Sequence, residues 1–297
     1  MKNIWFVIPT FNEEVVLEDS AKKLLEQREC LINSNRISQE SIILFVDDGS
    51  IDDSWSIIEK LHEENSAIKG LKLAKNSGQQ NAIFAGYEYA NGKCDAVISL
   101  DVDMQDDISI LGEIIDKYEK NDCEVVFVTH NNRNSDTFFK SATANAFYNV
   151  MKFLGANIVK NHSEYRLIDK NILNRLMQYK ESNLFLRGII PTLTNKVATI
   201  EIERKERVLG EAKYNFFSSL NLALDGITSL TVKPIRLIFL TGLLVFILGL
   251  FADTLDLFAI CIIGGLQIIF IGLIGEYIAK INIETKNRPK YFIEKEI

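Results

Sequence analysis

The chain has 297 residues, of which 47% are hydrophobic, and this length accommodates one large α/β domain with an additional element. Its formal net charge of -7 and its pI of about 5.2 argue against a nucleic-acid partner. The four cysteines have no paired spacing, which excludes a disulfide framework or a zinc site and predicts reduced thiols in the cytoplasm.

Up to about residue 230, short apolar runs alternate with stretches of helical spacing. The predicted strands are Ile4–Pro9, Ile42–Val46, Ile68–Leu73, Ala96–Leu100 and Val125–Thr129. The predicted helices are Glu14–Gln27, Ser54–Glu64, Gln79–Asn91, Ile108–Tyr118, Lys140–Leu154 and Lys170–Gln178. This alternation predicts a mostly parallel sheet with right-handed crossovers.

The composition changes near residue 234, where two long apolar segments begin. Ile235–Ala252 and Leu257–Ile274 are each about 18 residues long, near the lower limit for crossing a bilayer as a helix. Neither has a polar face, which favours membrane helices over a buried helical hairpin. Lysine and arginine flank the pair on its outer ends, whereas the short loop between them contains Asp253 and Asp256 and no base. The positive-inside rule therefore predicts two transmembrane helices in the cell membrane, with the large domain and both termini cytoplasmic.

The stretch before these segments, Asn215–Thr231, has apolar residues at roughly helical spacing. It fits an amphipathic helix lying on the bilayer and an ordinary core helix equally well. The predicted domains are a cytoplasmic α/β domain over 1–214, a juxtamembrane amphipathic helix over 215–233, a two-helix transmembrane hairpin over 234–279 and a cytoplasmic tail over 280–297.

Two acidic clusters, Asp47–Ser50 and Asp101–Gln105, follow predicted strands. The carboxyl ends of parallel strands open onto the crevice where α/β sheets bind ligands. Asp101 and Asp103 are two residues apart, so on an extended backbone they would point to the same side. Their oxygens suit Mg²⁺ or Mn²⁺ holding a diphosphate, and the alternative is a pair of acidic loops that cap helices.

The clusters belong to three stretches with a recognisable pattern, Pro9–Glu14, Val46–Asp52 and Asp101–Asp106. They resemble the signature of glycosyltransferase family 2, which has the GT-A fold. Further stretches resemble the polyprenyl-phosphate glycosyltransferase branch of that family, which includes bactoprenol glucosyltransferases and dolichol-phosphate mannose synthase. These stretches are Asn76–Ala82, Phe84–Gly86, Ser163–Leu167, Phe185–Gly188, Glu206–Tyr214 and Ile274–Ile278.

The resemblance implies an α/β fold of GT-A type, with a Rossmann-like, mostly parallel sheet, flanking helices and two transmembrane helices after it. It implies that the nucleotide-sugar is bound by Pro9, Phe11, Glu13, Asp47, Asp48, Asp101 and Gln105. It also implies that Mg²⁺ or Mn²⁺ is held by Asp101, Asp103 and Gln105. For Asp48, an alternative role is to cap the helix that begins near Asp53.

On the acceptor side, the resemblance implies a polyprenyl phosphate. Because its phosphate is already an anion at neutral pH, a strong general base is not required, and cations are needed instead. The candidates for phosphate and acceptor binding are Arg133, Arg207 and Lys213, with Lys140 as an additional candidate. The residues implied as catalytic are Asp103, Glu164 and Arg166.

Three positions depart from the pattern of the family. Glu164 stands where Asp is usual, which lengthens a carboxylate side chain by one methylene. His130 stands where Arg is common, and it would be a weaker, pH-dependent phosphate contact that Arg133 could replace. Ala212 replaces a usual Ser, which is a minor change.

Together these features predict a membrane-anchored, metal-dependent, inverting hexosyltransferase. Its donor would be UDP-glucose or UDP-GlcNAc and its acceptor undecaprenyl phosphate, for modification of a cell-wall polymer or O-antigen. The resemblance also implies a homo-oligomer whose membrane helices pack together. Two alternatives stay open, a GDP-mannose:polyprenyl-phosphate mannosyltransferase and a non-catalytic membrane scaffold that binds nucleotide-sugar.

Overall fold

The computed structural model describes residues 1–120, 122–130, 162–181, 185–202, 241 and 257–297. The strands are β1 Ile4–Thr10, β2 Ile43–Asp47, β3 Ile68–Leu73, β4 Ala96–Ser99, β5 Val125–His130, β6 His162–Asp169, β7 Val197–Ile202 and β8 Ile293–Glu296. They form one sheet of eight strands in the order β7-β5-β6-β4-β1-β2-β3-β8. Strands β1 to β4 pair in parallel, and so do β5 and β7, whereas β6 and β8 run antiparallel to their neighbours.

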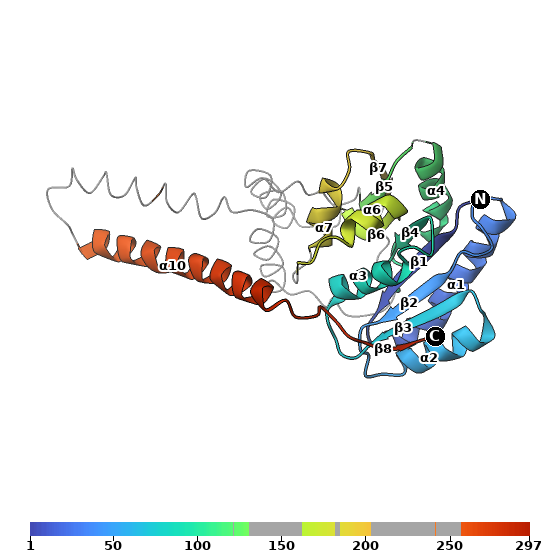
Figure 1. Cartoon of the computed structure of the whole chain (residues 1–297), viewed down its shortest axis with the longest axis horizontal. Helices are drawn as coiled ribbons and strands as arrows, with labels where there is room; N and C mark the ends of the chain where they lie inside the picture. The colour runs from blue at the N-terminus through green and yellow to red at the C-terminus, as the bar shows by residue number, and fades with distance from the viewer. Residues whose placement is uncertain (121, 131–161, 182–184, 203–240, 242–256) are drawn as a thin grey trace.

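Helices cover both faces of this sheet (Figure 1). They are α1 Glu14–Asn33, α2 Ser54–Glu64, α3 Gln79–Ala90, α4 Leu111–Lys120, α6 Lys170–Leu176, α7 Leu186–Ile189 and α10 Leu257–Lys286, with short 3₁₀ turns η1 Ile108–Ile110 and η2 Ile190–Thr192. Apolar residues of α1, α2 and α4 form one core cluster with the sheet, and those of α3, α6 and α7 form the other. Alternate residues of β1 belong to opposite clusters, as expected for a strand buried on both faces.

The mostly parallel GT-A type sheet with flanking helices is confirmed. The strands and helices predicted up to residue 130 are present, although α1 continues to Asn33 and the stretch predicted as Ile108–Tyr118 divides into η1 and α4. The predicted helix Lys140–Leu154 lies outside the described residues. Strands β6, β7 and β8 were not predicted, and β6 lies between β5 and β4.

Helix α3 contacts the sheet directly at one glycine. A Cβ atom added at Gly86 would clash with Val7 Cγ1 and lie 3.0 Å from Val46 Cγ2. These valines belong to β1 and β2, so the helix packs directly over the two central strands. The absence of a side chain at this position therefore permits the close contact of α3 with these strands.

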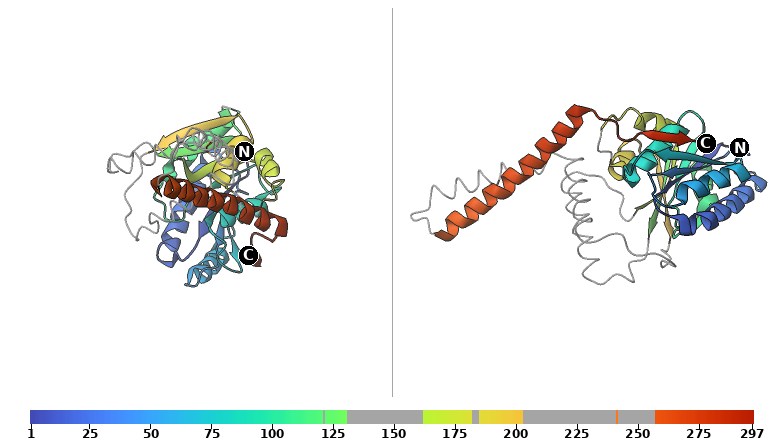
Figure 2. Two further views of the ribbon diagram at one scale, coloured as in Figure 1. Left: turned by 90° about the vertical axis from the view of Figure 1, so that its left-hand side faces the viewer. Right: turned by 90° about the horizontal axis from the view of Figure 1, so that it is seen from below.

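Helix α10 extends away from the sheet, whereas the residues after it return to the sheet edge (Figures 1 and 2). It contains the second apolar segment and continues to Lys286. Within the described part of the chain, one helical stretch, Leu266–Lys286, is long and apolar enough to cross a membrane, with a mean hydropathy of 1.5. Large apolar side chains along it, such as Ile268 and Ile271, are exposed. The first apolar segment and the predicted juxtamembrane helix lie outside the described residues.

The close approach of α3 is testable by substitution. Gly86→Ala should lower the free energy of unfolding by about 1–3 kcal/mol, because the added methyl group overpacks the contact with Val7. In a Val7→Ala background the same substitution should cost less, since the clashing atoms have been removed. Thermal or urea unfolding of the four proteins in this cycle measures the coupling. Equal costs in both backgrounds would contradict this packing.

Candidate active site

The carboxyl ends of β4, β1 and β2 lie side by side at one end of the sheet's strands. From β1 the chain passes to β2 and β3 on one side and then crosses to β4 on the other. Strand order reverses between β1 and β4, and such a switch point is where open α/β sheets bind ligands. Both predicted acidic clusters follow strands that end here, and Thr10 at the end of β1 pairs with Asp47 at the end of β2.

Asp47 is completely buried and retains one unused acceptor. Its Oδ2 atom accepts a hydrogen bond from the Ser50 amide at 3.2 Å, whereas its buried Oδ1 atom has no hydrogen-bond partner in the described structure. Burial raises the pKa of Asp47 above its ordinary value. A buried acceptor of this kind is normally satisfied, so it fits an N–H or O–H group of a bound ligand.

Asp48 holds the loop that leads into α3. Its carboxylate accepts the Ser77 amide at 2.7 Å and the Gly78 amide at 2.9 Å. Gly78 has a φ of 90°, a backbone conformation that favours glycine. The alternative role of Asp48 as a cap of the following helix is wrong, because the Ser54 amide at the start of α2 donates to Asp52 instead. Both oxygens of Asp48 are therefore bonded to the loop before α3 and not to α2.

The loops after β1 and β2 are joined by reciprocal hydrogen bonds. The Asn12 amide donates to Ser50 Oγ at 3.0 Å, and the Ile51 amide donates to Asn12 Oδ1 at 3.0 Å. This mutual fixation places the half-buried Phe11 and Glu13 beside the end of β2, while Pro9 is buried within β1. These three of the seven residues predicted for the nucleotide-sugar therefore lie at the same end of the strands as Asp47.

The second acidic cluster forms a turn. The Met104 amide approaches the Asp101 carbonyl oxygen at 3.5 Å, and Met104 has a φ of 49°. The expectation that Asp101 and Asp103 share a side because their backbone is extended is wrong, since β4 ends at Ser99 and the backbone bends here. Within this turn the Gln105 amide donates to Asp103 Oδ1 at 3.3 Å.

The acidic turn concentrates negative charge. Burial, with further contributions from the carboxylates of Asp103 and Asp106, raises the pKa of Asp101 to about 6, while the charges of Arg187 and Arg166 oppose the shift. His130, the departure from the family pattern, approaches Asp106 through Nε2 at 2.7 Å. Crowded carboxylates of this kind are a suitable donor set for a hard divalent cation. No cluster of three or more His, Cys, Asp or Glu in the described ranges could enclose a metal by itself.

Glu164 and Arg166 belong to a buried polar cluster on β6, next to β4. Arg166 is fully buried and forms an ion pair with Glu164 Oε2. Glu164 Oε1 accepts hydrogen bonds from Gln80 Nε2 at 2.8 Å and from Arg187 Nε at 2.6 Å. Both carboxylate oxygens are therefore engaged, and Glu164 connects β6 with the N-terminus of α3 and with α7.

Sequence reasoning did not select three residues that the fold brings into this site. Gln79 donates through Nε2 to Asp101 Oδ1 at 2.8 Å, and Gln80 and Arg187 meet at Glu164. All three lie in stretches quoted above for the family resemblance, so a signal for them existed. The predicted Arg133, Lys140, Arg207 and Lys213 lie outside the described residues.

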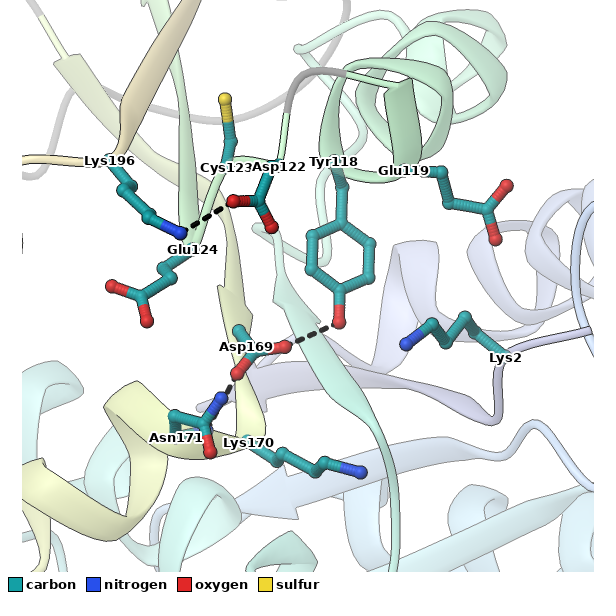
Figure 3. A pocket seen from close by; sticks show the side chains of 10 residues that line it. All are labelled: Lys2, Tyr118, Glu119, Asp122, Cys123, Glu124, Asp169, Lys170, Asn171 and Lys196. Carbon is teal, nitrogen blue, oxygen red and sulfur yellow. Dashed lines mark hydrogen bonds and ion pairs between the residues drawn. The ribbon is translucent and has the colours of Figure 1, made fainter.

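A separate cavity of about 480 Å³ lies at the opposite end of the parallel strands, beside Lys2, which precedes β1 (Figure 3). Two pairs of its side chains point toward each other: Lys196 Nζ donates to Asp122 at 2.5 Å, and the Tyr118 hydroxyl donates to Asp169 at 2.5 Å. Because it lies at the amino ends of the parallel strands, it is distinct from the crevice that contains the acidic clusters.

Comparison with known proteins agrees with this geometry. The family model described as glycosyl transferase family 2 matches residues 5–181. The uncharacterized glycosyltransferase YkoT of Bacillus subtilis is 42% identical, over 97% of this chain and 90% of that protein. The SfII prophage-derived bactoprenol glucosyl transferase of Shigella flexneri is 36% identical, over 98% of this chain and 97% of that protein.

Solved structures show the same fold at low sequence identity. Mannosyl-3-phosphoglycerate synthase from Rubrobacter xylanophilus has a TM-score of 0.53 at 13% identity, covering 79% of this chain and 74% of its own. Mannosyltransferase PcManGT from Pyrobaculum calidifontis, solved with GDP-Man and Mn²⁺, has a TM-score of 0.51 at 16% identity, covering 79% of this chain and 64% of its own.

The fold and the crevice thus define a transferase of the GT-A class. The chain belongs to glycosyltransferase family 2. Its relatives include proteins named bactoprenol glucosyl transferase that align over nearly the full chain, which confirms the resemblance to the polyprenyl-phosphate branch.

The role found for Asp48 predicts that the loop before α3 becomes less stable when one of the two acceptor oxygens is removed. In Asp48→Asn the side chain has a single acceptor oxygen, so one of the Ser77 and Gly78 amides loses its partner. We expect a loss of about 1–3 kcal/mol in stability and faster amide hydrogen exchange at both residues. Asp53→Asn is the matched control, because Asp53 is exposed and makes no capping hydrogen bond. Unchanged exchange at Ser77 and Gly78 would contradict this role.

Proposed function

We propose that this protein transfers a hexose from a nucleotide-sugar, UDP-glucose or UDP-GlcNAc, to undecaprenyl phosphate. The observation that carries the proposal is the crevice itself: the unused buried acceptor of Asp47 lies at the same switch point as the acidic turn Asp101–Gln105. The names of the bactoprenol relatives support the lipid acceptor. The product would be a lipid-linked sugar for modification of a cell-wall polymer or O-antigen.

On the donor side, Asp47 Oδ1 would accept a hydrogen bond from the base or ribose of the nucleotide. Pro9, Phe11 and Glu13 would line the same pocket, because the paired loops hold them beside the end of β2. Asp48 contributes indirectly by holding the backbone before α3. Donor binding is thus assigned to the ends of β1 and β2.

The diphosphate would lie over the acidic turn after β4. Asp101, Asp103 and Gln105 supply oxygen ligands that fit Mg²⁺ or Mn²⁺, and the cation would neutralise the departing diphosphate as a Lewis acid. Divalent cations bound with phosphates commonly take only one or two carboxylates from the protein, so a closed cage is not needed. The Mn²⁺ that accompanies GDP-Man in the PcManGT structure supports this assignment.

The acceptor phosphate is the nucleophile, and its approach requires positive charge. Arg187 is the best placed described cation, since its side chain is one third exposed and its charge acts on Asp101. Arg133, Arg207 and Lys213 are further candidates from the sequence. Attack of the phosphate oxygen on the anomeric carbon, opposite the leaving diphosphate, would invert the configuration at that carbon.

Glu164 would serve this reaction as a positioning residue. Both of its oxygens are occupied by Arg166, Arg187 and Gln80, and an already ionised phosphate needs no general base. Two arginines on one carboxylate leave a net positive charge, which suits an anionic acceptor. The longer side chain at this position lets the carboxylate span from β6 to α7.

The anchoring of the enzyme completes the proposal. Helix α10 and the first apolar segment would form a transmembrane hairpin over 234–279, preceded by a juxtamembrane helix over 215–233 and followed by a cytoplasmic tail over 280–297. The α/β domain over 1–214 would face the cytoplasm at the inner membrane, and packing of the membrane helices would form a homo-oligomer. The exposed isoleucines of α10 support membrane contact.

The reaction is tested directly by radiolabel transfer. The purified full-length protein in detergent is given undecaprenyl phosphate and a panel of labelled UDP- and GDP-sugars, with Mg²⁺, Mn²⁺ or EDTA. We expect label in the lipid fraction with UDP-glucose or UDP-GlcNAc and loss of that label with EDTA. Asp103→Asn should reduce transfer by about a hundredfold or more.

Three results would contradict the proposal. Transfer from GDP-mannose alone would identify the mannosyltransferase alternative. Binding of nucleotide-sugar without transfer, unchanged in Asp103→Asn, would indicate a scaffold. Transfer that persists in EDTA would remove the role of a divalent cation.

The assignment of Arg187 predicts an acceptor-specific defect. Arg187→Ala should lower kcat/KM for undecaprenyl phosphate about tenfold to a hundredfold, because a charged hydrogen bond to phosphate is lost. Arg187→Lys should recover part of this loss, since the charge is kept. Arg175→Ala is the matched control, because Arg175 is a half-exposed arginine that lies on neighbouring α6. A loss confined to donor affinity would place Arg187 on the donor side instead.

A further inference from the structure

The chain segment after α10 is firmly attached to the sheet. Strand β8 runs antiparallel to β3, with Lys295 opposite Lys72. Ile297 and Gly70 exchange two backbone hydrogen bonds, of 3.0 and 3.2 Å, and the Ala74 amide donates to the Phe292 carbonyl oxygen at 2.8 Å. These bonds extend the pairing over the full length of β8.

Side chains add contacts on the face of the sheet that α2 covers. Lys295 Nζ donates to Glu59 of α2 at 2.5 Å. Ile297 packs against the first core cluster, and Gly70 provides the space, because a Cβ atom there would lie 2.9 Å from Ile297 Cγ1. The attachment therefore uses backbone pairing, an ion pair and apolar burial together.

The residues between α10 and β8 also contact α3. The Tyr291 hydroxyl donates to Glu88, and Lys290 Nζ lies 4.1 Å from the centre of the Phe84 ring. Helix α3 is the element whose first turn holds Asp101 through Gln79 and Glu164 through Gln80. One helix thus contacts the returning segment along its length and the active site at its N-terminus.

The chain between α10, the candidate membrane helix, and the contact with α3 is short. Helix α10 ends at Lys286, and Lys290 is already in contact with α3. Four residues in extended conformation reach about 14 Å, so the Cα atom at the end of α10 lies no further than that from the Cα atom of Lys290. Figure 1 shows this end of α10 beside α3, while the rest of the helix extends away.

We propose that residues 287–297, the return segment, form a rigid connector that sets the height and tilt of the active site relative to the bilayer. This connector is called the splint below. The proposal rests on the proposed function only in taking α10 as a membrane helix and a lipid phosphate as the acceptor. The phosphate of a polyprenyl lipid is held at the membrane surface. A catalytic domain with a fixed orientation meets it without losing rotational freedom at each encounter.

The test lengthens the splint without removing its docking contacts. Eight Gly and Ser residues are inserted between Asn287 and Arg288 of the full-length protein, which adds a flexible span of about 15 Å. The matched control has the same insertion before Gly92, which lies in an exposed turn with open space around it. Strand β8 and its partners are unchanged in both variants.

The first readout does not depend on activity. A dye on the exposed Cys30 reports energy transfer to headgroup-labelled lipid in vesicles of phosphatidylethanolamine and phosphatidylglycerol, with Cys261→Ser in all proteins. The parent and the control should give one narrow distance distribution, and the lengthened splint a broad one. Equal distributions, or a parent that does not associate with the vesicles, would overturn the proposal.

The second readout compares two acceptors. The lengthened splint should slow transfer to undecaprenyl phosphate in vesicles on the order of tenfold, and leave transfer to a short, water-soluble prenyl phosphate within about twofold of the parent. An equal loss with both acceptors would indicate damage to the domain, and no loss with either would remove the positioning role. If the parent transfers no sugar at all, the proposed function fails, while the distance measurement still decides the splint.

Discussion

The position of α3 is the constraint on which the rest of the site depends. Gly86 allows the helix to lie directly on the central strands, and Asp48 holds the two amides that precede its first turn. The contact at Gly86 therefore sets the distance between the helix and the sheet, and Asp48 sets the position of the helix N-terminus. From that position Gln79 reaches the acidic turn after β4, and Gln80 reaches Glu164 on β6. Side chains from distant parts of the chain meet because one helix cannot shift.

Charge in the crevice is organised by sign. The carboxylates after β2 and β4 lie together, and burial with mutual repulsion raises the pKa of Asp101. Beyond them, Arg166 and Arg187 surround a single carboxylate, that of Glu164. The reaction proposed above needs this division, because a nucleotide diphosphate and an acceptor phosphate would repel each other. A cation on the acidic side and arginines on the other would hold them at adjacent positions.

The same helix connects the active site with the return segment, residues 287–297. Its C-terminal half contacts the return segment through Phe84 and Glu88, and that segment follows the one described helix that is long and apolar enough to span a bilayer. A sheet edge in a soluble enzyme is commonly left short or covered. Here the edge beside β3 is used to attach the chain that returns from α10. The active site and this candidate membrane helix are therefore linked through packed structure.

The sequence by itself determined the elements up to residue 130 and the two acidic clusters, because buried strands and amphipathic helices have distinct local periods. It did not predict β6 or β8, since strand pairing depends on residues far apart in the chain, and β8 has no continuous apolar run. Only the tertiary structure showed that Asp101 lies in a turn and that Arg187 and Gln80 converge on Glu164. The period of apolar residues indicates the local secondary structure and its buried face. Which side chains come into contact depends on packing between elements that are far apart in the sequence.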